Sequence, residues 1–218
     1  MRDSFMAGLF ITFEGSEGCG KSTQVKYLTE RLEAVGASVI NTREPGGTPI
    51  GEAIRDLLQH QKAGVGMSAE AELLLFSASR AELVRKVIEP ALAAGTHVVS
   101  DRFYDSTTVY QGEARGLGRE AVETITRMAT GERQPDLTFL LDLPVDIAFA
   151  RLKERNGGGG KFDRFEALPT TFFEEVRRGY LDLASREPSR VQILDGQESE
   201  EKLAEQIWER LESLLHGH

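Results

Sequence analysis

Residues 9–22 read Leu-Phe-Ile-Thr-Phe-Glu-Gly-Ser-Glu-Gly-Cys-Gly-Lys-Ser, and this stretch decides the fold. Residues 15–22 match the pattern G-x-x-x-x-G-K-[ST], a glycine-rich loop whose backbone N–H groups hold phosphate. The apolar run 9–14 predicts a strand before the loop, and residues 21–35 predict a helix after it. Because a helix N-terminus is positively polarised, this context predicts a site for the phosphates of a nucleotide.

Each position of the loop is a candidate phosphate contact, and these positions are Gly15, Ser16, Glu17, Gly18, Cys19, Gly20, Lys21, Ser22 and Thr23. We expect Lys21 to reach the outer phosphates and the Ser22 hydroxyl to bind Mg²⁺. Cys19 is the only cysteine, so an intramolecular disulfide is excluded. A thiol in this place is either reactive or a small residue at a variable position, and the second interpretation is favoured.

The bulk composition predicts one α/β domain over residues 1–218, with 40% hydrophobic and 28% charged residues. No apolar run approaches the ~20 residues of a membrane-spanning helix, and residues 1–8 carry no signal-peptide pattern. We therefore expect a cytoplasmic protein without a membrane partner. The net charge of -9 also argues against nonspecific binding to nucleic acid.

Short apolar runs alternate with longer helical stretches, which is typical of a parallel sheet covered by helices on both faces. The predicted strands are 9–14, 38–42, 97–101, 137–143 and 191–195. The predicted helices are 21–35, 49–59, 68–94, 118–131, 145–155, 170–185 and 200–215. The sequence thus predicts a three-layer α/β fold with a five-stranded parallel sheet and no internal repeat.

Two charged residues stand where the predicted strand 97–101 ends, Asp101 as its last residue and Arg102 directly after it. Asp101 and Arg102 project at the carboxyl edge of the sheet, where open α/β folds bind ligands. Asp101 is a candidate Mg²⁺ ligand and Arg102 a candidate contact for an acceptor phosphate. The alternative is an ordinary surface ion pair.

Residues 42–48, Thr-Arg-Glu-Pro-Gly-Gly-Thr, predict a tight exposed turn after the second strand. Taken alone, this segment could be a turn and nothing more, and the sequence does not settle whether the bond before Pro45 is cis. In the helix 68–94, Phe76 and Arg80 lie one turn apart on one face. They could stack on a flat base and bind it by hydrogen bonds, although Phe76 fits a plain core position equally well.

Four consecutive glycines at 157–160 cannot stay helical, since each costs about 1 kcal/mol relative to alanine. Alone they would be a flexible linker. Basic residues flank them, with Arg151 and Arg155 on one helical face before them and Lys161 and Arg164 after them. A mobile arginine-rich lid over residues 151–166 suits phosphoryl transfer, which needs positive charge around the moving group.

These segments together resemble the thymidylate kinase family over residues 9–215. The resemblance is carried by residues 13–23, the turn 43–48, Phe76 with Arg80, the segment 101–103 with Ser106 and 110–112, and the segment 163–166. It implies a P-loop nucleoside-monophosphate kinase fold, ATP-dependent phosphorylation of dTMP to dTDP with Mg²⁺, and a homodimer.

The resemblance also implies roles for individual residues. Phe76 would stack on thymine, Arg80 would bond to the base, Arg102 would hold the dTMP phosphate, Glu17 would meet the sugar 3′-hydroxyl and Tyr110 would crowd the 2′ position. Thr107 and Gln111 would lie near the base, and Arg43, Glu44 and Pro45 would shape the acceptor-phosphate edge. Phe103 stands where the family often has Tyr or His, and together with Thr107 it leaves the exact base contacts open.

The variable loop positions 16–19 contain no arginine, although some family members carry one there. The lid must then supply the catalytic charge, with Arg155 and Arg164 as first candidates and Arg151 and Lys161 next. One rival is a nucleoside-monophosphate kinase for another acceptor. Others are a generic ATP-binding module and a GTP-dependent switch, and the switch lacks its Asn-Lys-x-Asp motif because the only asparagines, Asn41 and Asn156, precede Thr and Gly.

Overall fold

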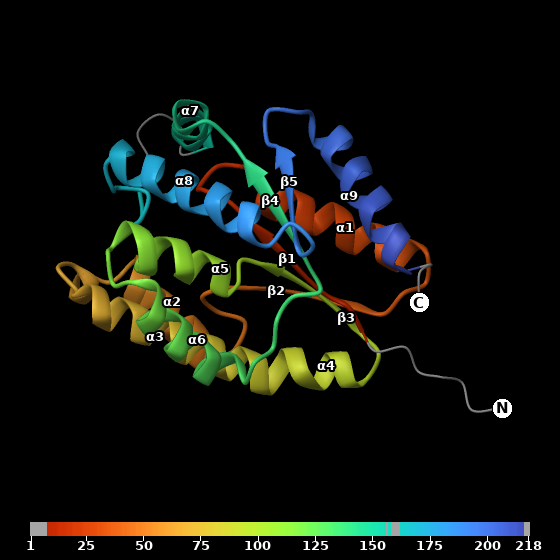
Figure 1. Ribbon diagram of the computed structural model, residues 1–218, viewed down its shortest axis with the longest axis horizontal. Helices are drawn as coiled ribbons and strands as arrows, with labels where there is room; N and C mark the ends of the chain where they lie inside the picture. Colours follow the sequence, from red (N-terminus) through yellow and green to blue (C-terminus); the bar gives the residue numbers. More distant parts are fainter. Residues whose placement is uncertain (1–7, 156, 158–161, 216–218) are drawn as a thin grey trace.

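The computed structural model describes residues 8–155, 157 and 162–215, and its strands form one parallel sheet in the order β2-β3-β1-β4-β5 (Figure 1). The strands are β1 (Phe10–Glu14), β2 (Val39–Arg43), β3 (His97–Asp101), β4 (Leu137–Asp142) and β5 (Val191–Asp195). All residues of β1 are buried, as are most of β3 and β4, because helices cover both faces of a parallel sheet. The predicted five-stranded parallel sheet is confirmed.

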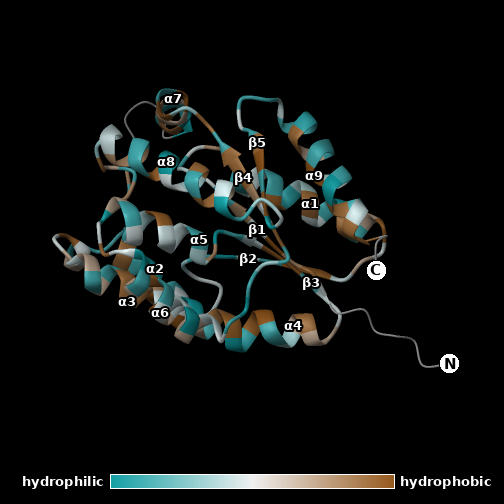
Figure 2. Cartoon of the chain, in the orientation of Figure 1, coloured by the Kyte–Doolittle hydropathy of each residue, from teal (hydrophilic) through white to brown (hydrophobic). Residues whose placement is uncertain are grey.

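The α-helices are α1 (Lys21–Ala34), α2 (Pro49–Gln59), α3 (Ala69–Leu83), α4 (Glu89–Ala93), α5 (Tyr104–Thr107), α6 (Arg119–Thr130), α7 (Val145–Arg155), α8 (Thr170–Arg186) and α9 (Glu200–Leu215). A 3₁₀ turn, η1 (Lys62–Gly64), and two π-helical segments, η2 (Val84–Ile88) and η3 (Thr108–Ala114), complete the helical structure of the described residues. Apolar residues of α1 and α9 cover one face of the sheet. On the other face, α3, η2 and α4 cover β1 and β3, while α8 and η3 cover β4. Figure 2 shows the hydrophobic colour concentrated on the strands and on the inward sides of the helices.

On the face of the sheet that α3, α4 and α8 cover, buried polar residues lie between the two apolar clusters. Thr12 and Glu14 of β1 point to this face, alternating with Phe13 on the opposite face. Thr12 Oγ1 lies 2.8 Å from Thr138 Oγ1 on β4, and Asp105 accepts two hydrogen bonds from Arg190 close by. The polar groups are therefore paired with one another.

The chain crosses the sheet in opposite directions after β1 and after β3. Strand β1 leads through α1 to β2, which lies on the β3 side, whereas the chain after β3 crosses to β4 on the far side of β1. Ligands of open α/β folds bind at the carboxyl ends of strands at such a reversal. Both the phosphate loop and the Asp101-Arg102 pair lie at this point.

Two helical segments differ from the sequence predictions. The predicted helix 68–94 contains the π-helical segment η2 just before Pro90. Proline has no N–H to donate to the carbonyl group four residues earlier, and its ring clashes with that carbonyl group, so the regular α-helix is interrupted there. The helical segment α5–η3 was not predicted, since its Thr, Val and Gly residues have low helix propensity. Packing of Val109 and Tyr110 against α8 stabilises it instead.

None of the helices among the described residues is both long and apolar enough to cross a bilayer.

Candidate active site

The phosphate loop follows β1 and depends on glycine at two crowded positions. Gly15 and Gly18 have φ angles of 138° and 74°. A Cβ atom on Gly15 would lie 2.6 Å from the carbonyl oxygen of Leu141, and one on Gly18 would lie 2.7 Å from that of Ala148. Only glycine combines these angles with such close contact, so the loop packs tightly against β4 and α7.

The N-terminus of α1 is left open for an anion. Its N-cap residue, Gly20, has no side chain to accept from the first N–H groups. By contrast, Thr48 caps α2 by accepting from Gly51 N at 3.0 Å, and Ser68 caps α3 by accepting from Ala71 N at 3.2 Å. The uncapped N–H groups of α1 and its positive end therefore remain available for phosphate oxygens.

Lys21 lies inside the loop. Its Nζ donates to the carbonyl oxygens of Gly15 at 3.2 Å and Ser16 at 2.8 Å. The Cys19 thiol lies 3.6 Å from Nζ and is buried, so it fills space beneath the loop. The ammonium group is thus held by carbonyl groups of the loop, next to the start of α1.

Ser22 and Asp101 come together at the switch point. Ser22 Oγ donates to Asp101 Oδ2 at 2.5 Å, although 79 positions separate them in the chain. Both side chains line the same cavity. Hydroxyl and carboxylate oxygens are the donors that Mg²⁺ prefers, so the residues fit a magnesium site completed by substrate oxygens and water.

Arg102 lies directly after β3 in a left-handed conformation, with φ 75°. Its Nη2 donates to Glu17 Oε1 at 2.6 Å, and its Nη1 donates to Gly15 O, Ser106 Oγ and Tyr180 OH at 3.0, 2.9 and 3.2 Å. A non-glycine residue in this region is strained, and such strain collects at functional sites. Although burial opposes charge on both groups, their pairing lowers the pKa of Glu17 and raises that of Arg102.

A buried carboxylate supports Arg102 from below. Glu14 accepts from Phe103 N at 2.7 Å, Ser106 Oγ at 2.6 Å and Tyr180 OH at 2.8 Å. Burial, with a contribution from nearby Asp105, raises the pKa of Glu14 to about 7, although Arg102 and these donors oppose the rise. Sequence reasoning did not assign a role to Glu14 or Tyr180, because β1 reads as plain strand and Tyr180 as a core residue of α8.

Arg80 and Glu44 form a buried pair on the other side of the cavity. Arg80 Nε donates to Glu44 Oε2 at 2.9 Å, Nη2 donates to the same oxygen at 2.5 Å, and Nη2 also donates to Thr107 Oγ1 at 2.9 Å. Burial raises the pKa of Glu44 even though Arg80 opposes the rise. Among the described residues, Nη1 of Arg80 is buried and has no hydrogen-bond partner. One edge of the guanidinium group therefore has no hydrogen-bond partner in the described part of the chain.

The wall around Arg80 combines aromatic and polar groups. Phe76 packs edge-on against Phe165 with ring centroids 5.7 Å apart and is only half-buried. Gln111 is buried, and Tyr110 extends its hydroxyl towards Arg102 at 3.4 Å. The bond between Glu44 and Pro45 is cis.

The basic residues of the predicted lid divide into two groups. Arg151 and Arg155 of α7 line the cavity, and Arg155 forms an ion pair with Glu166. Arg164 is not among the cavity-lining residues: its Nε donates to Leu58 O at 2.6 Å and its Nη2 lies 2.6 Å from Glu72 Oε2. The expectation that Arg164 faces the phosphates is thus not met in this arrangement. Lys161 and the glycines 158–160 lie outside the described residues.

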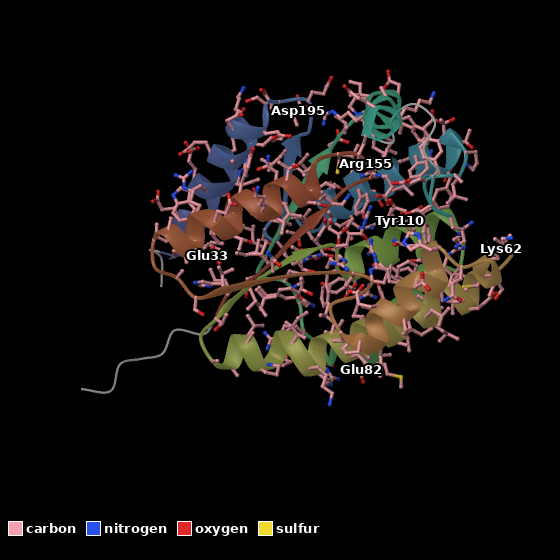
Figure 3. The ribbon with its side chains drawn as sticks, turned by 180° about the vertical axis from the view of Figure 1, so that it is seen from behind. Glu33, Lys62, Glu82, Tyr110, Arg155 and Asp195 are labelled. Atoms are coloured by element: carbon pink, nitrogen blue, oxygen red, sulfur yellow. The ribbon has the colours of Figure 1, made fainter. Side chains whose placement is uncertain are left out.

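One cavity of about 850 Å³ connects these groups. Figure 3 labels Tyr110 and Arg155, which come from η3 and from the end of α7 and both line it. The remaining predicted residues on its wall are Glu17, Gly18, Cys19, Gly20, Lys21, Ser22, Thr23, Arg43, Glu44, Pro45, Phe76, Arg80, Asp101, Arg102, Thr107, Gln111 and Arg151. Gly15 and Ser16 do not line it but hold Lys21 through their carbonyl groups.

Sequence reasoning missed several residues of the wall. Arg55 of α2 lines the cavity and donates to Pro45 O at 3.0 Å, but in the sequence it looks like one more charged residue of an amphipathic helix. Gln197 and Ser199 follow β5, and a search of every strand end for polar residues would have found them.

A phosphate loop that shares one cavity with a basic and aromatic wall and with two arginines of α7 defines a P-loop nucleoside-monophosphate kinase. A sequence model of the family described as "Thymidylate kinase" matches residues 13–207. Since this match covers most of the chain, the protein belongs to the thymidylate kinase family.

Individual relatives agree with this assignment. The chain is 47% identical to the thymidylate kinase of Pseudomonas putida (strain GB-1) over 212 residues, covering 97% of each chain. It is 50% identical to that of Desulfosudis oleivorans over 190 residues, covering 86% of this chain and 88% of the relative. The crystal structure of thymidylate kinase from Ehrlichia chaffeensis superposes with a TM-score of 0.70 at 33% identity, covering 86% and 93% of the two chains.

Proposed function

We propose that the protein transfers the γ-phosphoryl group of ATP to dTMP, yielding dTDP and ADP for dTTP synthesis. The observation that carries this proposal is a single cavity that holds the phosphate loop at one end and the buried Arg80–Glu44 pair at the other. The relatives named above are thymidylate kinases, and the alignment with this chain spans most of the length of each. Transfer between two bound nucleotides requires both pockets to open into one space.

On the donor side, Lys21 and the open N–H groups of the loop and α1 bind the ATP phosphates. Lys21 already lies at the loop, and its Nζ exchanges the Gly15 and Ser16 carbonyls for phosphate oxygens when ATP binds. Ser22 and Asp101 hold Mg²⁺, which when bound neutralises charge on the phosphate oxygens. Gln197 and Ser199, beyond β5, border the space left for the rest of ATP.

On the acceptor side, Arg102 holds the dTMP phosphate and Glu17 meets the sugar 3′-hydroxyl. The free Nη1 edge of Arg80 donates to a carbonyl oxygen of the base, while Glu44 and Thr107 fix its orientation. Phe76 stacks on the base, Gln111 bonds to it, and Tyr110 restricts space beside the sugar. Arg43, Glu44 and Pro45 form the edge next to the acceptor phosphate.

The chemistry requires alignment and positive charge, not covalent catalysis by protein. Arg151 and Arg155 lie on the cavity wall and supply charge at the transferring group. Arg164 would first have to leave its ion pair with Glu72, so it is the less well placed candidate. Closure of the lid over both nucleotides excludes water and limits hydrolysis of ATP.

We also propose a cytoplasmic homodimer. In support of the dimer, α2, α3 and α6 lie side by side (Figure 1) and expose Ile50, Leu74 and Met128 at 55, 56 and 86%. Such apolar side chains on adjoining helices suit an interface between copies. Sedimentation of the wild type and of Leu74→Glu tests it, with a dimer expected only for the wild type.

The acceptor is tested by ADP release with Mg·ATP and equal concentrations of dTMP, dUMP, dGMP, dCMP, AMP and UMP. We expect the highest kcat/KM with dTMP. A preference for a purine nucleotide would instead support a related kinase with another acceptor. ATP turnover that no nucleotide stimulates would contradict the proposal.

A further inference from the structure

A buried carboxylate on α3 lies behind the base pocket and is used by none of the roles above. Glu72 is 1% exposed and lies one helical turn before Phe76. Its Oε1 accepts from Gln111 Nε2 at 2.8 Å and from Arg115 Nε at 3.2 Å. Its Oε2 accepts from Arg115 Nη2 at 3.3 Å and lies 2.6 Å from Arg164 Nη2.

The partners of Glu72 decide how the Gln111 amide is turned. An ionised carboxylate has acceptors only, so the NH₂ group of Gln111, and not its carbonyl oxygen, must face it. Arg115 and Arg164 balance the negative charge, which makes the buried carboxylate tolerable. The amide of Gln111 is thereby locked in one of its two orientations.

The opposite end of the amide belongs to the cavity. Gln111 lines the cavity, and within the described residues no hydrogen bond occupies its Oε1. The pocket therefore presents a carbonyl acceptor from Gln111 and an N–H donor from Arg80 Nη1 to a bound base. Thymine offers the complementary N3–H donor and a carbonyl acceptor at C4.

We propose that Glu72 is a positioning residue that sets base specificity by holding the Gln111 side chain with its carbonyl oxygen towards N3 of the base. The inference rests on the proposed function and deepens it. A cytosine base carries a lone pair at N3, which would face the Gln111 oxygen without a proton between them. A site built for a hydrogen bond rejects an analogue that leaves its buried polar group unpaired.

The test is the Glu72→Gln variant with two acceptors that differ only at N3 and C4, dTMP and 5-methyl-dCMP. A glutamine at 72 has nearly the same shape but offers an NH₂ group as well as a carbonyl, so Gln111 can turn over. We expect the ratio of kcat/KM for dTMP over 5-methyl-dCMP to fall by about 10-fold or more, mainly through KM. An equal loss for both acceptors, or an unchanged ratio at normal activity, would overturn the proposal.

Arg115→Met is the matched control. Arg115 contacts Glu72 and the Phe172 ring, with its guanidinium carbon 5.0 Å from the ring centroid, but makes no hydrogen bond to Gln111. Its loss perturbs the packing of the cluster without giving Gln111 a new partner. We expect the acceptor ratio to stay unchanged, and a fall as large as that of Glu72→Gln would count against the proposal.

A measurement on the unaltered protein separates this inference from the proposed function and does not depend on a folded variant. The ¹⁵N side-chain amide of Gln111, assigned by its loss in Gln111→Met, should exchange slowly with solvent before any nucleotide is added. Rapid exchange would show that the NH₂ group faces the cavity and would overturn the inference. If dTMP is not phosphorylated but the amide is protected, the proposed function fails and the orientation stands.

Discussion

Arg102 at the end of β3 and Glu17 in the phosphate loop form an ion pair, with Nη2 2.6 Å from Oε1. The pair joins the donor end of the cavity to its acceptor end. Because both groups keep exposed fractions of 13 and 26%, a nucleotide can reach them from the cavity. In the proposed function, these two residues meet the phosphate and the sugar of the same acceptor.

Arg102→Met should lower kcat/KM for dTMP by roughly 10²-fold or more, because it removes a preorganised positive group that binds the acceptor phosphate. Steady-state kinetics at saturating ATP measures this. Arg178→Met is the control, since the Arg178 side chain is 71% exposed and its one ion pair within the described part of the chain is with neighbouring Glu175 on α8. A loss of similar size in both variants would remove the assigned role.

Two substitutions at Tyr110 separate its ring from its hydroxyl. Among the described residues its hydroxyl makes two long contacts, 3.4 Å from Arg102 Nη2 and 3.5 Å from Glu17 Oε1, so we expect the ring to carry the steric effect. Tyr110→Ala should narrow the preference for dTMP over its ribonucleotide counterpart, whereas Tyr110→Phe should preserve it. Competition assays measure the preference, and an equal ratio in all three proteins would exclude a role of the ring in sugar selection.

Glu44→Gln should lower the free energy of unfolding by about 3–5 kcal/mol, because it leaves the Arg80 guanidinium buried without its counter-charge. Glu89→Gln is the matched control: Glu89 binds Arg133 through the same two-pronged geometry, but both side chains are more than a third exposed. Glu89→Gln should lower the free energy of unfolding by less than about 1 kcal/mol, because an exposed ion pair contributes little. Urea unfolding compares them, and equal effects would contradict the argument from burial.

The pH dependence of stability should change in Glu14→Gln. Burial raises the pKa of Glu14 from 4.5 to about 7, so the folded state binds this proton more tightly than the unfolded state. Its stabilising contribution is then full below pH 4.5 and is lost as the pH rises through about 7. Relative to Glu14→Gln, the wild type should lose stability between pH 5 and 8 in denaturant titrations. A constant difference over that range would show that the carboxyl group is ionised throughout.

Local patterns predicted most of the framework. The phosphate loop, the five strands and the order of most helices follow from short apolar runs, glycine positions and periodicity, which act within a few residues of each other. The α5–η3 segment was missed because long-range packing, not propensity, makes it helical.

The candidate site was only partly predictable from the sequence. Positions at strand ends, such as Asp101 and Arg102, were found because parallel strands bring their carboxyl ends to one edge. The partner of Arg164 was not found, because its pairing with Glu72 joins residues 92 positions apart on separate segments. A basic residue beside a flexible segment does not by itself show which way its side chain turns.

In the proposed function, the phosphoryl group passes directly between two nucleotides bound in one cavity. This transfer is tested most directly by incubating the protein with Mg²⁺, dTMP and ATP labelled at the γ-phosphate, and then separating the products. We predict that the label appears in dTDP in equal amount to ADP, and that Lys21→Ala lowers this rate by roughly 10²-fold or more. Label released only as inorganic phosphate would contradict direct transfer to dTMP, and label transferred at the wild-type rate by Lys21→Ala would contradict the role of Lys21.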